Sequence, residues 1–155
     1  MNARSTVSDS MPLENDIAIA HQSFAHHAKS FRLAANFLPE ENIDDIAVLY
    51  HFCRLVDDAV DEAPTIDQAH RNLEEIEQLL QSNQSSHLDA FKNVVQKHRI
   101  PMHAIQALMQ GCEGDLHPVR IKTLRELSQY CYQVAGSVGE MMSPLLNVTS
   151  PEATQ

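Results

Sequence analysis

Apolar side chains recur along this chain at intervals of three and four residues, the spacing of helices that bury one face. No segment alternates convincingly between apolar and polar positions, as a half-buried strand would. The pattern therefore predicts an all-α fold. The predicted helices cover residues 14–25, 31–37, 40–62, 66–81, 87–98 and 101–116, and a final long helix follows Thr123.

Two neighbouring stripes run along the predicted helix 40–62. One is an apolar seam suited to packing against other helices, formed by Ile46, Leu49, Cys53, Val56 and Val60. The other becomes polar toward its C-terminal end, where it contains Tyr50, Arg54, Asp57 and Asp61. Residues three and four positions apart on a helix point the same way. One face is thus expected to build the core, while the adjacent face lines a site that is open to water.

The acidic end of this helix contains an electrostatic conflict. Asp57 with Asp61, and Asp58 with Glu62, are like-charged pairs four residues apart, and each pair costs about 0.2–0.5 kcal/mol on an isolated helix. All four carboxylates also lie in the last turns before Pro64, where the helix macrodipole disfavours negative charge. A bound Mg²⁺ would relieve this repulsion, because the ion takes oxygen ligands and commonly combines carboxylates with phosphates.

Two explanations fit these crowded carboxylates. The first is a solvated acidic face, which the Asp-x-x-x-Asp spacing alone favours. The second is a binding site, because Tyr50 and Arg54 share the stripe with the carboxylates. Such a stripe could hold a divalent cation at one end and an anionic, apolar ligand along its length, which is the chemistry of a prenyl diphosphate. The residues of the stripe support the two explanations about equally.

Length and composition exclude several classes of protein. With 155 residues the chain is most simply one domain, and a chain of this size can bury about 68–70% of its unfolded surface. The formal net charge of −10 and the lack of a basic stripe argue against nucleic acid as a partner. No stretch approaches the roughly 20 consecutive apolar residues of a membrane span.

The three cysteines, Cys53, Cys112 and Cys131, do not have the spacing of a metal site, so we expect them to be small buried hydrophobic residues. Their odd number, without a secretory signal, favours a reducing, cytoplasmic location. Residues 1–12 are small and polar and are expected to form a disordered tail. Residues 13–155 are then expected to belong to one helical domain.

The final helix has a clear start signal and an unusual interior. Thr123 and Glu126 form a capping-box pattern, which predicts that the helix starts there. Residues 134–139 read Val-Ala-Gly-Ser-Val-Gly, although each mid-helix glycine costs about 0.8–1 kcal/mol relative to alanine. These small residues indicate either close packing against another helix or a slot for a flat hydrocarbon chain. The slot would lie beside Tyr130, Val134 and Val138.

Three separated segments together resemble one known family. They are His27-Ala-Lys-Ser-Phe31 with the following Phe37-Leu-Pro39, then Leu49-Tyr-His-Phe-Cys-Arg-Leu-Val-Asp-Asp-Ala-Val-Asp-Glu62, and finally Tyr130-Cys-Tyr-Gln-Val-Ala-Gly-Ser-Val-Gly-Glu140. In this order and spacing the chain resembles the squalene/phytoene synthase family of head-to-head prenyltransferases. The resemblance extends over residues 21–151.

The resemblance implies a fold, a reaction and a set of site residues. The fold is an isoprenoid-synthase-type helical bundle with a central cavity, in which two prenyl diphosphates are joined through a cyclopropylcarbinyl diphosphate. Asp57 and Asp61 match the first aspartate-rich motif, which binds Mg²⁺, or Mn²⁺, bridged to the diphosphate. Tyr50 and Arg54 complete the implied catalytic set. The implied substrate-binding residues are His27, Ala28, Lys29, Ser30, Phe31, Tyr50, Arg54, Tyr130, Val134 and Val138. Metal ligation by His26 or His27 is the weaker interpretation of those two residues.

The chain departs from the family pattern in one respect. Members carry a second aspartate-rich motif on a later helix, and no aspartate follows Glu140 here. We therefore expect the N-terminal half of the family's bundle, truncated before the second aspartate-rich helix. Such a chain is either a fragment of a longer protein or a truncated form that is inactive alone.

Two further hypotheses remain beside the leading one, a phytoene synthase-type prenyltransferase of carotenoid biosynthesis. A squalene or dehydrosqualene synthase-type member is the first, and a squalene-type member would also use NADPH. The second is a non-catalytic helical module that binds prenyl diphosphate or a partner, with self-association through exposed apolar seams. Under the prenyltransferase hypotheses the hydrocarbon product is an oil, which is compatible with peripheral contact between the protein and a membrane. A di-iron bundle is disfavoured, because no Glu-x-x-His motif occurs.

Overall fold

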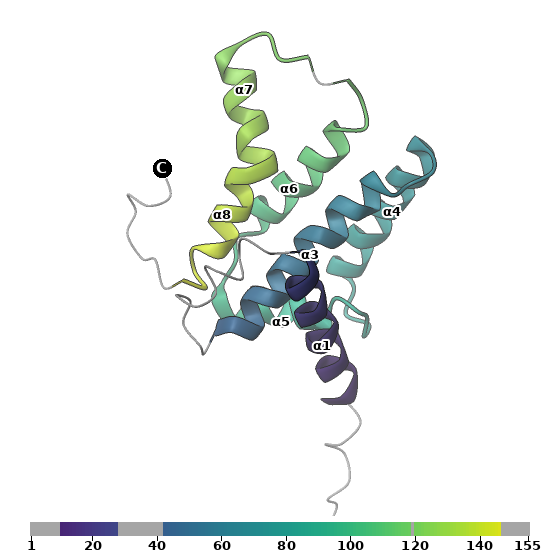
Figure 1. The fold of residues 1–155 in the computed structure, drawn as a ribbon, viewed down its shortest axis with the longest axis vertical. Coiled ribbons are helices and arrows are strands. Elements are labelled where there is room, and N and C mark those ends of the chain that lie inside the picture. Colours follow the sequence, from purple (N-terminus) through teal and green to yellow (C-terminus); the bar gives the residue numbers. More distant parts are fainter. Residues whose placement is uncertain (1–9, 28–41, 119, 147–155) are drawn as a thin grey trace, which may run out of the picture.

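Helices account for the regular structure of residues 10–27, 42–118 and 120–146, the part of the chain that this computed structural model describes, and no strand occurs there (Figure 1). The elements are α1 (Ser10–His27), α3 (Ile43–Asp61), α4 (Ile66–Gln81), α5 (Asp89–His98), α6 (Met102–Gly114), α7 (Leu124–Cys131), the π-helical turn η2 (Tyr132–Gly136) and α8 (Ser137–Met142). The predicted all-α fold is confirmed.

The helix boundaries agree with the sequence pattern in some places and differ in others. α4 has the predicted bounds, and Thr65 caps its start by accepting a hydrogen bond from the backbone N–H of Gln68. α1 begins at Ser10 instead of residue 14, so the predicted tail 1–12 is too long at its end. Pro12 does not prevent this, since proline is tolerated in the first turn of a helix. The predicted helix 31–37 lies outside the described residues.

Two other starts shift for local reasons. α5 begins at Asp89 instead of residue 87, because the side chain of Asp89 accepts a hydrogen bond from the backbone N–H of Ser86 and holds a turn before the helix. α6 begins after Pro101, which occupies the N-cap position instead of the first turn. Proline has no N–H to donate, so this position costs no backbone hydrogen bond.

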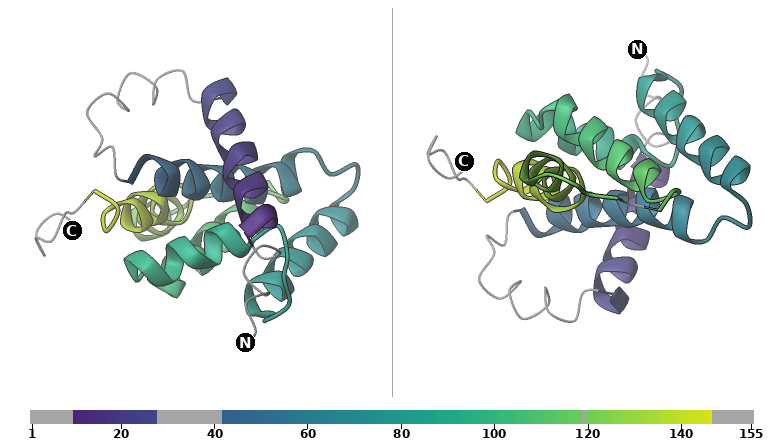
Figure 2. Two further views of the ribbon diagram at one scale, coloured as in Figure 1. Left: turned by 90° about the horizontal axis from the view of Figure 1, so that it is seen from below. Right: turned by 90° about the horizontal axis from the view of Figure 1, so that it is seen from above.

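Helix α3 runs through the middle of the bundle and contacts α1, α4, α5, α6 and α8 (Figures 1 and 2). Figure 2 shows α1 lying across it at a steep angle. Three members of the predicted seam, Ile46, Leu49 and Val56, are buried, while Cys53 and Val60 are half-buried. The helix also buries Ala47, Val48 and Phe52. Its buried surface is wider than the predicted seam because neighbours pack on more than one side.

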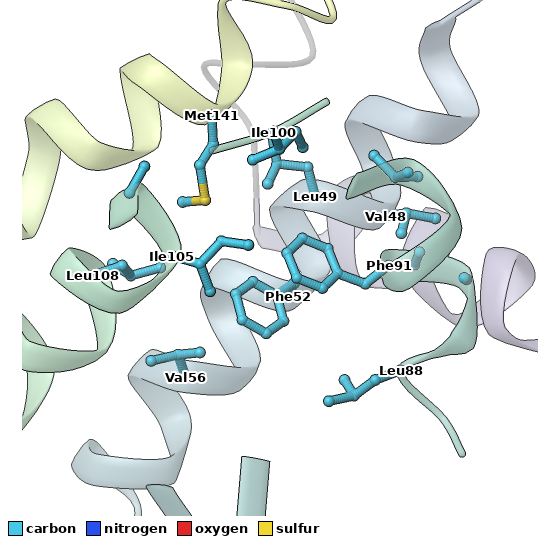
Figure 3. Packing of buried hydrophobic residues seen from close by; sticks show 14 of the residues in the cluster. Val48, Leu49, Phe52, Val56, Leu88, Phe91, Ile100, Ile105, Leu108 and Met141 are labelled. Carbon is cyan, nitrogen blue, oxygen red and sulfur yellow. The ribbon is translucent and has the colours of Figure 1, made fainter. Parts of the chain in front are cut away.

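The core gathers side chains from helices that are far apart in the sequence (Figure 3). The rings of Phe52 and Phe91 stack with their centroids 3.7 Å apart and join α3 to α5. Ile105 from α6 and Met141 from α8 are as deeply buried as Leu49 of α3. Burial of apolar surface of this kind is the main favourable contribution to folding.

The predicted final helix is confirmed at its start and interrupted in its middle. Glu126 donates its backbone N–H to Thr123 Oγ1 (3.2 Å), and Glu126 Oε2 accepts the backbone N–H of Thr123 (3.1 Å), which completes the capping box. The π-helical turn η2 then separates α7 from α8. It packs on α6 at Gly111, where an added Cβ would come within 3.1 Å of the carbonyl carbon of Gln133.

Helix α7 projects from the bundle and buries none of its residues (Figure 1). Leu124 is 82% exposed and Leu127 is 42% exposed. Cys131, in its last turn, is exposed as well, so the expectation of a buried thiol is wrong there, because no other helix covers this face within the described residues. No helix among these residues has the length and apolar character needed to cross a membrane.

Candidate functional site

The acidic end of α3 is organised around one arginine. Arg54 Nη1 donates to Asp57 Oδ2 at 2.7 Å, and Nη2 of the same guanidinium donates to Asp58 Oδ1. The three side chains are partly buried, with 32% of the Arg54 side chain exposed. The stripe predicted from spacing thus brings Arg54 and Asp57 together, and it adds Asp58, which was not among the predicted site residues. Asp58 follows Arg54 by four positions, so the same helical spacing could have found it.

Burial and neighbouring carboxylates raise the pKa of Asp57. Partial burial is the first cause that raises its pKa, and the charges of Asp61, Asp58 and Asp115 raise it further, while Arg54 lowers it. The electrostatic conflict expected from the sequence is therefore present, and the guanidinium offsets part of it. Asp61 itself is exposed.

One polar atom in this cluster lacks a partner. Nε of Arg54 is buried and makes no hydrogen bond among the described residues. A buried donor that is left unpaired costs about 1–3 kcal/mol. An anionic oxygen placed beside the guanidinium would satisfy it through a charge-assisted hydrogen bond.

A second group of residues faces this cluster from α6 and α7. The hydroxyl of Tyr130 donates to Asp115 Oδ1 at 3.2 Å. Asp115 follows the end of α6, and its charge acts on Asp57 of α3. Burial first, then the charges of Asp57, Asp115 and Asp61, raises the pKa of the Cys112 thiol to about 12, so both groups act on this residue. The C-terminal ends of α3 and α6 therefore share one acidic neighbourhood, with Tyr130 at its edge.

Asp115 was not found by sequence reasoning. It lies fifteen positions before Tyr130, beyond the reach of any single helix period, and no motif includes it. The two side chains come together where α6 packs against η2 and α8, the segments that follow α7.

The predicted wall residues lie on η2 and α8. Val134 and Val138 are half-buried, and Val138 packs against the core. A Cβ added at Gly139 would meet nothing within 4 Å, and one added at Gly136 would meet the ring of Tyr132 of the same helix at 3.0 Å. Within the described residues, these two glycines do not serve close packing against another helix. Open space of this kind is compatible with the predicted hydrocarbon slot.

The remaining predicted residues are placed only in part. Tyr50 is half-buried and packs against the core beside the acidic stripe. His27 is the last residue of α1, and its side chain lies outside the described part of the chain. Ala28, Lys29, Ser30 and Phe31 lie outside the described residues altogether. The substrate contacts expected of residues 27–31 stay predictions.

Asp57 and Asp61 fit a metal that takes most of its ligands from elsewhere. No group of three or more His, Cys, Asp or Glu side chains suited to a metal occurs within residues 10–27, 42–118 and 120–146. Mg²⁺ commonly uses one or two carboxylates and completes its octahedron with water and substrate phosphates. Two carboxylates one turn apart, beside an arginine with an unpaired donor, match that donor set and not a closed metal cage.

Comparison with known proteins finds one family and several relatives. A family model described as squalene/phytoene synthase matches residues 24–155. The 4,4'-diapophytoene synthase of Staphylococcus haemolyticus is 31% identical over 140 residues, which are 86% of this chain and 49% of that protein. The phytoene synthase of Rhodobacter capsulatus is 31% identical over 150 residues, covering 92% of this chain and 44% of that protein.

A third relative and a solved structure agree with these. The 15-cis-phytoene synthase of Enterobacter agglomerans is 30% identical over 137 residues, covering 78% of this chain and 45% of that protein. A crystal structure of a dehydrosqualene synthase in complex with ligand superposes with a TM-score of 0.74 at 27% identity, covering 86% of this chain and 48% of that one. The chain spans about half the length of the relatives it matches.

Proposed function

This chain belongs to the squalene/phytoene synthase family, and we propose that it forms half of the catalytic bundle of a magnesium-dependent prenyltransferase that joins two prenyl diphosphates head to head. The observation that carries this proposal is the cluster at the acidic end of α3. There Arg54 is held by two carboxylates and keeps one buried donor unpaired, beside Asp57 and Asp61.

Each residue of the cluster has a definite role in this proposal. Arg54 donates charge-assisted hydrogen bonds to diphosphate oxygens, for which its unpaired Nε is available. Asp57 and Asp61 hold Mg²⁺, and Tyr50 lines the same stripe. Bound Mg²⁺ supplies Lewis acidity that neutralises the leaving diphosphate. The partial burial that raises the pKa of Asp57 also strengthens its attraction for a cation, since a low local dielectric screens charges less.

The hydrocarbon part of the substrate would lie away from this polar end. Val134 and Val138 offer an apolar wall on η2 and α8, and Gly139 leaves space beside it. Apolar walls exclude water, which would otherwise capture an allylic cation. Residues 27–31 are proposed to contact the diphosphate as well.

For the substrate, we favour geranylgeranyl diphosphate and a phytoene-type product. Two of the relatives named above, both near 30% identity, are phytoene synthases. The dehydrosqualene-type alternative is supported by the diapophytoene synthase relative and by the similar solved structure. A squalene-type member, which would use NADPH, has no specific support here.

Calorimetry with a non-ionising ligand tests the proposed site. The probe is the thiodiphosphate analogue of geranylgeranyl diphosphate, added to the 155-residue chain in the presence of Mg²⁺. Asp57→Asn and Asp61→Asn should each weaken binding about tenfold or more, because a metal ligand is lost. Asp67→Asn, on the exposed first turn of α4, is the matched control and should leave binding unchanged. Equal binding by the wild-type chain and the two α3 variants would contradict the metal role.

A second candidate function rests on α7. Its apolar side chains are exposed, with Leu124 at 82%, and exposed apolar surface often marks an interaction site. Under this alternative the chain is a helical module that pairs with a partner and does not bind prenyl diphosphate. The calorimetric experiment separates the two, since the module alone would show no magnesium-dependent binding of the analogue.

A further inference from the structure

The contact between Tyr130 and Asp115 joins α7 to the end of α6. Asp115 ends α6, where its backbone N–H bonds to the carbonyls of Gly111 and Cys112, each at 3.2 Å. Tyr130 lies in the last turn of α7, and its hydroxyl donates to Asp115 Oδ1 at 3.2 Å. The backbone of Asp115 is thus fixed by its own helix, which makes its carboxylate a well-placed acceptor.

Apolar packing does little to hold Tyr130 in place. α7 buries none of its residues, and Tyr130 is only half-buried. A phenol on such a helix could turn into water, because exposed side chains change rotamer within nanoseconds. Among the described residues, the hydrogen bond to Asp115 is the polar contact that directs this ring toward α6.

The pair also faces the acidic end of α3. The charge of Asp115 is close enough to raise the pKa of Asp57, and it acts on Cys112 together with Asp57 and Asp61. Asp115 thus accepts the hydrogen bond of Tyr130 and is near enough to Asp57 for its charge to act on that carboxyl. Removing Asp115 would affect the orientation of Tyr130 and the charge of the proposed metal site at the same time.

We propose that Asp115 is a positioning residue for Tyr130: its carboxylate accepts the only proton of the phenol and holds the ring beside the acidic end of α3, with the oxygen lone pairs left for the ligand. This rests on the proposed function of the α3 site. A tyrosine hydroxyl has one donor, so a phenol committed to Asp115 acts toward a ligand as an acceptor. It then does not compete with Arg54 for diphosphate oxygens, and the diphosphate is directed to the arginine.

A purely structural tie between α6 and α7 predicts different behaviour, and three variants separate the two roles. Asp115→Asn keeps an acceptor oxygen and removes the charge, Asp115→Ala removes both, and Tyr130→Phe removes the hydroxyl. The matched control is Glu113→Gln, which neutralises a nearby carboxylate of α6 that pairs with His70 at 3.3 Å.

The first measurement is the titration of the phenol. Carbon-13 NMR of labelled tyrosine follows the Cζ signal of Tyr130, which Tyr130→Phe identifies. The hydrogen bond to Asp115, followed by its charge, raises the pKa of Tyr130. Asp115→Asn should therefore lower the pKa of Tyr130 relative to the wild-type chain, and Glu113→Gln should leave it unchanged. The same titration in Asp115→Asn and in the wild-type chain would overturn the proposal.

The second measurement is a double-mutant cycle on binding of Mg²⁺ with the geranylgeranyl thiodiphosphate analogue. Asp115→Ala, which removes the acceptor, should weaken binding about three- to tenfold in the wild-type background and change it little when Tyr130 is already phenylalanine, since groups in contact are not additive. Equal effects in both backgrounds would overturn the positioning role. If the wild-type chain itself fails to bind the analogue, the proposed function fails, while the titration still decides whether Asp115 controls Tyr130.

Discussion

Arg54 is the residue on which the polar end of α3 depends. Its planar guanidinium reaches Asp57 and Asp58 with separate nitrogens, and a lysine ammonium cannot reproduce this fork. We expect Arg54→Lys to weaken magnesium-dependent binding of the prenyl diphosphate analogue about tenfold, as measured by calorimetry. Arg71→Lys is the control, because Arg71 is exposed and bonds only to Gln68 among the described residues. Loss of affinity of the same size in both variants would refute a specific role for Arg54.

Gly111 is a residue whose lack of a side chain has a structural reason. A Cβ there would lie 3.1 Å from the carbonyl carbon and 3.2 Å from the carbonyl oxygen of Gln133, and backbone atoms cannot easily move aside. We expect Gly111→Ala to lower the free energy of unfolding by about 1–3 kcal/mol, the usual cost of overpacking. Urea unfolding measures this. Gly114→Ala is the matched control, since nothing lies within 4 Å of its Cβ, and it should be neutral or slightly stabilising.

Asp45 links protonation to stability. Burial works to raise its pKa, but hydrogen bonds from His98 and Lys97 outweigh that effect, so the pKa of Asp45 is lowered from the ordinary value of 3.8. A carboxyl whose folded pKa is lowered stabilises the protein above its unfolded pKa, and this stabilisation is lost as the pH falls through the folded pKa.

The corresponding prediction concerns acid unfolding. Asp45→Asn should reduce the stability of the chain at neutral pH and make stability fall less steeply below pH 3.8, the unfolded value. Thermal unfolding as a function of pH measures both effects. Glu74→Gln, an exposed carboxylate on α4, is the control and should keep the wild-type slope. A wild-type slope in Asp45→Asn would contradict the linkage.

At the level of the helices, local signals could be predicted and long-range ones could not. The bounds of α4 and the capping box at Thr123 depend on residues within four positions of each other, so the sequence contains them. The π-helical turn η2 lies where the backbone of Gln133 packs on Gly111 of α6. Such a contact between distant segments leaves no periodic trace in the sequence.

In the candidate site, too, contacts within one helix could be predicted from the sequence, while contacts between helices could not. Arg54, Asp57 and Asp61 share one helix, so their spacing was enough to predict them as a group. Asp115 joins them only through the packing of α6 beside α3, and its bond to Tyr130 depends on the packing of α6 against η2 and α8, which follow α7. The family resemblance supplied Tyr130 without indicating this partner.

Helix α7 exposes apolar side chains that could drive self-association. Its exposed leucines leave an apolar face without a described neighbour, and such faces favour association. We expect the wild-type chain to self-associate with increasing concentration in light scattering. The double variant Leu124→Glu/Leu127→Glu should remain monomeric, because charge at these positions opposes burial. A wild-type chain that stays monomeric at all concentrations would show that this face does not drive association.

At the scale of the whole molecule, the buried core and the exposed helix α7 lie in different parts of the described bundle. The core around α3 is closed by five other helices, whereas α7 and the acidic end of α3 face outward. The chain spans about half the length of its relatives. Within the described residues, the polar part of the proposed site takes its side chains from α3, from α7 and from Asp115 at the end of α6.

The most direct measurement is the affinity of the wild-type chain for geranylgeranyl thiodiphosphate with Mg²⁺ and with the metal removed by chelation. If the acidic end of α3 holds a cation that carries diphosphate, Mg²⁺ should tighten binding at least about tenfold, because without it the carboxylates repel the ligand. Identical affinity with and without Mg²⁺ would contradict a cation-assisted diphosphate site on α3.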